Sequence, residues 1–84
     1  MEEENAVRAE AAARLARALG HLRYVRRMVE RNQDCAEVLI QLAAVNGALS
    51  GVTNLLLNAL LDDALAAPAE TADEFRRVIN WLLK

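Results

Sequence analysis

The chain has 84 residues, of which 55% are hydrophobic and 26% charged, and its net charge is −2. This length allows one domain, so residues 1–84 are expected to form a single helical domain, and so small a chain is marginally stable alone. One cysteine excludes a disulfide framework. A single histidine, without a Gly-rich phosphate loop or an acid pair on an apolar face, argues against an enzyme.

The charges are unevenly distributed along the chain. Residues 8–31 hold seven arginines against Glu10 and Glu30, a local charge of +5, whereas residues 1–7 and 32–84 are acidic. The acidic start Met1–Asn5 lacks the cationic and apolar regions of a signal peptide, and the unpaired thiol fits a reducing compartment. We therefore expect a cytoplasmic protein with a basic first helix.

The first predicted element is an amphipathic helix over residues 5–31. At 100° per residue one side gathers apolar residues, namely Ala11, Leu15, Ala18, Leu22, Val25 and Val29. The opposite side gathers Arg14, Arg17, His21, Arg23, Arg27 and Arg31, with Tyr24 among them. Gly20 interrupts this helix, which close packing by another backbone would explain.

A turn at residues 32–34 precedes the second predicted helix, which covers residues 35–65. Asp34 is a suitable N-cap and Glu37 completes a capping box, so Cys35 takes the first helical position. The polar residues of this helix are expected to form one narrow stripe: Glu37, Gln41, Asn46, Ser50, Asn54, Asn58 and Asp62. Since the rest of its surface is apolar, one partner helix cannot cover it and a second chain is implied.

The second helix is also a candidate membrane span. Residues 38–61 are uncharged, and Gly47 and Gly51 form a small-xxx-small pattern. Recurring amides within the segment and the absence of an aromatic belt favour a soluble oligomer instead. We therefore expect no membrane partner.

The third predicted helix follows Pro68. Thr71 and Glu74 fit a capping box, and the helix is expected to run to about residue 83. Its apolar face would carry Phe75, Val78, Ile79 and Leu82, with Trp81 at the edge. No strand pattern occurs, so the sequence predicts an all-α fold.

The first two helices resemble a known family. Arg14-Leu15-Ala16-Arg17-Ala18-Leu19-Gly20-His21 resembles the Arg-x-x-Arg-x-x-Gly-Gln/His core of the copper-sensitive operon repressor (CsoR) family, which includes the nickel/cobalt sensor RcnR and the formaldehyde sensor FrmR. The similarity continues through residues 28–30 and from Cys35 to Val45. The resemblance implies a three-helix protomer, an antiparallel dimer with a four-helix-bundle core and a disc-like tetramer. It also implies a repressor that binds operator DNA and releases it on binding an inducer.

The metal site implied by the resemblance is incomplete in this chain. Cys35 matches the family's first ligand, but the co-ligand positions 25 and 29 residues later hold Leu60 and Ala64, which cannot bind metal. Cys35 is thus a remnant ligand, and the family precedent of Cu(I), Ni(II) or Co(II) gives no cofactor here. Other family features are missing too: Glu2 replaces the proline of formaldehyde sensors, and Asn46 and Ser50 replace a mid-helix arginine.

Each candidate site has two interpretations. The arginines Arg14, Arg17, Arg23, Arg27 and Arg31 either contact DNA phosphates or form a solvated face paired with acidic side chains. Cys35, beside a helix N-terminus with Arg31 one turn earlier, is either a reactive sensor thiol or a small buried hydrophobe. His21 is expected to be structural or to contact phosphate rather than to bind metal.

These observations favour a homo-oligomeric DNA-binding repressor in which metal sensing is lost or altered. Because the arginines lack accompanying amides, recognition of backbone shape is favoured over base readout. The alternative is a helical interaction protein that has lost operator binding and acts through mixed oligomers with an intact paralogue.

Overall fold

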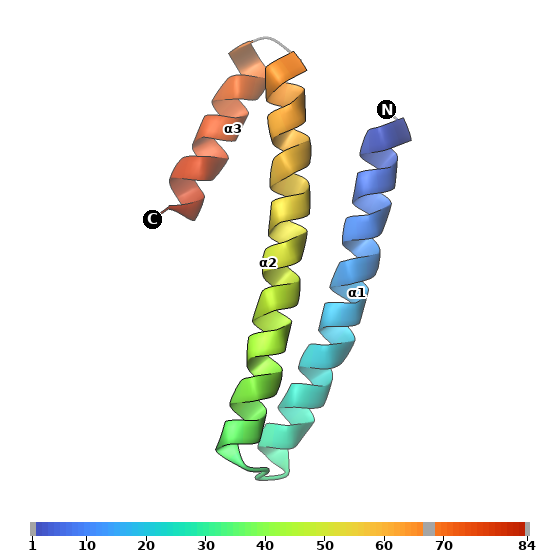
Figure 1. Cartoon of the computed structure of the whole chain (residues 1–84), viewed down its shortest axis with the longest axis vertical. Helices are drawn as coiled ribbons and strands as arrows, with labels where there is room; N and C mark the ends of the chain where they lie inside the picture. Colours follow the sequence, from blue (N-terminus) through green and yellow to red (C-terminus); the bar gives the residue numbers. More distant parts are fainter. Residues whose placement is uncertain (1, 67–68, 84) are drawn as a thin grey trace.

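The computed structural model describes residues 2–66 and 69–83. Its three α-helices are α1 (Glu2–Glu30), α2 (Cys35–Ala66) and α3 (Ala69–Leu82). Figure 1 shows α1 antiparallel to α2, with α3 folded back along the other side of α2. Within the described residues α1 and α3 make no contact, so α2 is the central element. The predicted all-α protomer with a long central helix is confirmed.

The turn between α1 and α2 is a C-terminal cap followed directly by an N-cap. Asn32 has a φ of 55°, the left-handed conformation that asparagine tolerates better than most residues. The Gln33 N–H donates to the Met28 carbonyl at 3.0 Å and the Asn32 N–H to the Val29 carbonyl at 3.1 Å, which is a Schellman motif. The Asp34 carbonyl then accepts from the Val38 N–H at 3.0 Å, so α2 begins at Cys35 as predicted.

Helix α3 begins earlier than predicted. The capping box at Thr71 would start the helix at residue 72, whereas α3 starts at Ala69 and contains Thr71 in its first turn. Ala69 and Glu70 are good helix formers, and an acidic side chain in the first turn favours the helix dipole. Pro68 lies outside the described residues. Phe75 and Ile79 are half-buried against α2 and Trp81 is 74% exposed, in agreement with the predicted face.

The core of the single chain is small. Its buried side chains, within the described residues, are Ala11, Ala18, Val25, Met28, Val45 and Val52. Four come from α1 and two from α2, so they mark the line along which these helices pack. The apolar side of α1 is wider than this line, because Leu15 and Leu22 remain 44% and 43% exposed.

The protomer is a flat, single layer of helices. Its extents are 52 × 30 × 14 Å and its radius of gyration is 16.6 Å, against about 12 Å for a compact domain of this length. Its accessible surface is 6620 Å², whereas a compact monomer of this mass exposes about 5000 Å². The excess of roughly 1600 Å² is apolar to a large degree, since fifteen large hydrophobic side chains among the described residues are at least 36% exposed.

The polar residues of α2 do not form one stripe. Gln41 is half-buried and faces α1, whereas Asn46, Ser50, Asn54 and Asn58 are exposed. The prediction of a single stripe is therefore wrong at Gln41. By length and composition α2 could also cross a membrane. Its most apolar 18-residue stretch has a mean hydropathy of 1.5, and only 11% of that stretch is buried within the chain. An interface helix of an oligomer gives the same pattern, because its apolar surface is covered by another copy.

Candidate functional site

A row of three exposed arginines runs along the second half of α1 and ends at Arg31, the residue after α1, whose N–H still donates to the Arg27 carbonyl at 3.0 Å. Arg23, Arg27 and Arg31 are four residues apart and therefore lie on adjacent turns of the helix, about 6 Å from one to the next. Among the side chains that the structure describes, none of the three forms an ion pair. The Arg27 guanidinium lies 6.0 Å from the centre of the Tyr24 ring, a cation–π distance. We call these residues the outer arginine row.

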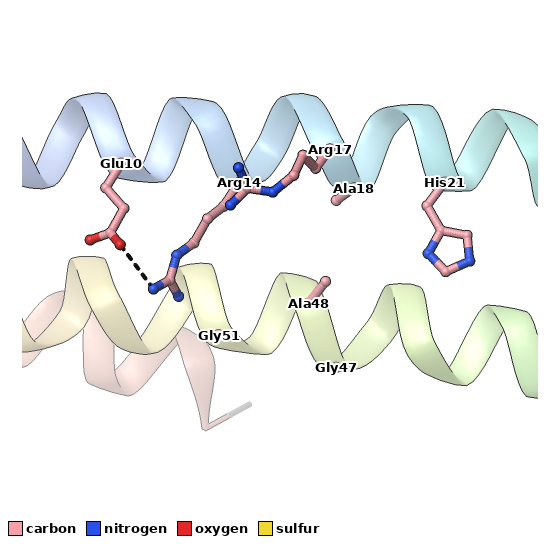
Figure 2. Close-up of a pocket in the computed structure, with 8 residues that line it drawn as sticks. All are labelled: Glu10, Arg14, Arg17, Ala18, His21, Gly47, Ala48 and Gly51. Carbon is pink, nitrogen blue, oxygen red and sulfur yellow. Dashed lines mark hydrogen bonds and ion pairs between the residues drawn. The ribbon is translucent and has the colours of Figure 1, made fainter.

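Arg14 has a different position from the outer arginine row. Its Nη2 atom donates to Glu10 Oε1 at 3.1 Å, and its Nη1 atom lies 3.8 Å from where a Cβ on Gly51 would stand. The side chain therefore crosses toward α2, as Figure 2 shows. The sequence predicted an outward-facing Arg14, but residue 14 lies one turn from both Ala11 and Ala18, which contact α2.

His21 likewise faces α2 rather than solvent. Its Nε2–H donates to Gln41 Oε1 at 2.7 Å, which joins the two helices through a half-buried hydrogen bond. This agrees with the expected structural role and corrects the expected outward orientation. The pairing of His21 with Gln41 was not predicted, because each residue was expected on the polar face of its own helix.

Arg14 and His21 belong to a groove between α1 and α2. Its volume is about 470 Å³ and its lining consists of Glu10, Arg14, Arg17, Ala18, His21, Gly47, Ala48 and Gly51. The α2 side carries no side chain larger than a methyl group, and in Figure 2 the charged side chains come from the α1 side. Arg17 is exposed and its guanidinium extends along α1 toward Arg14.

Cys35 is exposed at the first residue of α2. It therefore does not pack in the core of its own chain, and the interpretation as a buried hydrophobe is not supported within the protomer. Leu60 and Ala64 lie about 37 and 43 Å further along the same helix. Within the described residues no three His, Cys, Asp or Glu side chains cluster to hold a metal.

Leu60 lies where α2 faces α3. It is half-buried and lines a groove against α3 together with Val78 and Leu82. Leu60 also lines a second groove, which contains Glu74, Arg77 and Trp81 and no histidine or cysteine among its described lining residues. The structure thus keeps Cys35 apart from both co-ligand positions of its own chain.

The described part of the chain is a helical hairpin with an outer row of arginines, a large exposed apolar surface and no catalytic cluster. These are features of an oligomeric nucleic-acid-binding protein. A family model, Metal-sensitive transcriptional repressor, matches residues 7–82. The chain belongs to this family of repressors, which confirms the resemblance to the copper-sensitive operon repressor and RcnR type. A search of curated proteins finds no match.

Family membership defines the broad properties of the protein. It is a member of a family of non-enzymatic transcriptional repressors, so the expectation that it is not an enzyme is confirmed. The family implies operator DNA and further copies of the same chain as partners, and a cytoplasmic location.

Proposed function

We propose that this protein represses transcription by binding the backbone of operator DNA as a homotetramer. The outer arginine row carries the proposal, because three exposed cations on successive helical turns, none with an acidic partner among the described side chains, match a phosphate backbone. Arg17 extends this surface toward the N-terminal half of α1, and Arg14, whose side chain is 40% exposed, lies at its edge over α2, which completes the set Arg14, Arg17, Arg23, Arg27 and Arg31.

The assembly we propose is an antiparallel dimer with a four-helix-bundle core, of which two form a disc-like tetramer. The excess surface of the single chain supports it, since a stable interface takes about 800 Å² from each partner. The excess of roughly 1600 Å² provides for two such interfaces per protomer. The family's use of several identical chains supports the same assembly.

We also propose that metal sensing is lost or altered. In an antiparallel dimer the start of one α2 approaches the end of the other, so Cys35 would meet the partner's residues at positions 60 and 64. These are leucine and alanine, which leaves one thiolate and no further ligand of the family set. Cys35 is accessible to small reagents in the single chain, and any remaining response would rest on its thiol alone.

The DNA proposal is tested by measuring affinity against salt concentration with a duplex from upstream of the gene. Each phosphate contact contributes about 0.9 to the slope of log affinity against log salt. The variant with Arg23→Gln, Arg27→Gln and Arg31→Gln should lower the slope by about 2.7 for each protomer that contacts DNA. Arg26→Gln is the matched control, because Arg26 already pairs with Glu30 at 3.5 Å.

Two results would contradict the proposal. One is an affinity of the unmodified protein that does not change with salt. The other is a triple variant with the same slope as Arg26→Gln, which would show that the outer arginine row does not contact phosphates.

A further inference from the structure

The groove between α1 and α2 combines two guanidinium groups with a floor of small residues. Arg14 and Arg17 reach it from α1, and Gly47, Ala48 and Gly51 form its α2 side. A Cβ on Gly47 would meet nothing within 4 Å, so there is room above that residue. The volume of about 470 Å³ is in the range of small-molecule sites.

The charge of the groove is positive despite the carboxylate of Glu10. Glu10 offsets one of the two arginines, so one positive charge remains with His21 neutral. The Glu10 oxygen takes a hydrogen bond from Nη2 of Arg14, while Nη1 is directed toward Gly51. The pair is an exposed i,i+4 ion pair, which is weak and readily exchanged for another anion. Arg17 has no acidic partner among the described side chains.

The Arg14 guanidinium is held over α2, not on the outer arginine row. DNA is a broad rod that reaches exposed cations most easily, whereas a small ion can enter between two helices. We propose that this groove is an effector site for a small oxyanion, a free phosphate or carboxylate group held by Arg14 and Arg17.

Occupation of the groove has a consequence for DNA binding. Arg14 and Arg17 are also in the set proposed to contact the operator, so a bound oxyanion takes two cations from DNA and lowers its affinity. This regulatory part rests on the proposed function, whereas binding of the oxyanion itself does not. The groove would thus supply an inducer site in a chain whose metal ligands are missing.

His21 provides a direct readout of the groove. It is the only histidine in the chain and it lines the groove, so its ring signals in NMR spectra report occupancy without any label. We would titrate the full-length protein with inorganic phosphate and pyrophosphate at fixed pH and ionic strength, with chloride as the balancing salt. The expected result is a saturable shift of the His21 ring signals with no change in oligomeric state.

Two variants locate the binding. Arg17→Gln removes the unpaired cation and should weaken binding about tenfold or more, the effect of losing a charged hydrogen bond. Gly47→Leu fills the groove with every charge unchanged, and should abolish the saturable shift. Arg27→Gln in the outer arginine row is the control, and should leave the phosphate titration as in the unmodified protein.

Four results would contradict the site or its regulatory role. A linear shift with phosphate, or equal binding by Gly47→Leu and the unmodified protein, would overturn the site. A shift caused by a short DNA duplex and by neither phosphate nor pyrophosphate would assign the groove to the DNA surface and overturn the proposal. Saturable phosphate binding without any loss of DNA affinity would keep the site and overturn its regulatory role.

Discussion

Replacing Leu19 by alanine should weaken self-association of this protein about 30-fold. Leu19 lines an apolar groove with Leu15, Leu22 and Leu49, on the side of the α1–α2 pair away from Arg14. These leucines are 40–48% exposed in the single chain. Full burial of a leucine stabilises by about 2 kcal/mol, so covering the exposed half of Leu19 contributes about 1 kcal/mol.

The effect doubles in a two-fold dimer, because the same residue occurs on both faces of the interface. Two substitutions per dimer thus cost about 2 kcal/mol, which is about 30-fold in the dissociation constant. Sedimentation analysis across a dilution series measures this constant. Leu83→Ala is the control, since Leu83 is 79% exposed just after the end of α3 and outside this groove.

An unchanged dissociation constant in Leu19→Ala would refute the assignment of this groove to the interface. An equal loss in Leu83→Ala would refute it too, because the effect would then not be specific to the groove. Reduced association with retained helicity is the expected pattern, since alanine is a better helix former than leucine.

Two further predictions concern metal binding and the glycine within α1. In equilibrium dialysis the purified protein should bind no Cu(I), Ni(II) or Co(II) at one ion per protomer. The double variant Leu60→His/Ala64→Cys should gain such binding, and adding Cys35→Ser to it should abolish the binding again. Sub-micromolar binding by the unmodified protein would contradict this prediction. Gly20→Ala should stabilise the protein by about 1 kcal/mol in urea unfolding, because a Cβ at Gly20 meets nothing within 4 Å of its own chain. A loss of stability would instead reveal that a partner subunit packs against this glycine.

The helix boundaries around the first turn were predictable because local chemistry sets them. Asn32 and Asp34 act on backbone groups within five residues; α2 begins at Cys35 as predicted, and α1 ends at Glu30, one residue before the predicted end. At α3 the local signals conflict, since Thr71 can cap a helix that starts at residue 72, but the helix starts three residues earlier, at Ala69. Composition predicts that the chain has more apolar surface than it can bury alone. It does not predict where on the helices the surface that contacts another copy lies.

The residue types of the candidate site could be predicted from the sequence, but the direction in which their side chains point could not. A helical wheel places Arg14 about 60° from Ala11 and His21 about 40° from Val25, on one flank of the apolar side, but it does not say toward which flank α2 packs. Met28 was missed as a core residue for the same reason, although it is 3% exposed. The choice of flank is made by tertiary contacts such as the His21–Gln41 hydrogen bond, whose two members are 20 residues apart.

Because α1 and α3 make no contact within the described residues, α2 connects the helix that carries the arginines to the C-terminal helix. A helix of 32 residues resists bending, so it would transmit a disturbance at one end as a tilt or rotation of the whole rod. Binding at α3 or at the end of α2 would therefore reorient the arginines of several copies together. In such an arrangement the stiffness of α2 would make the subunits respond cooperatively.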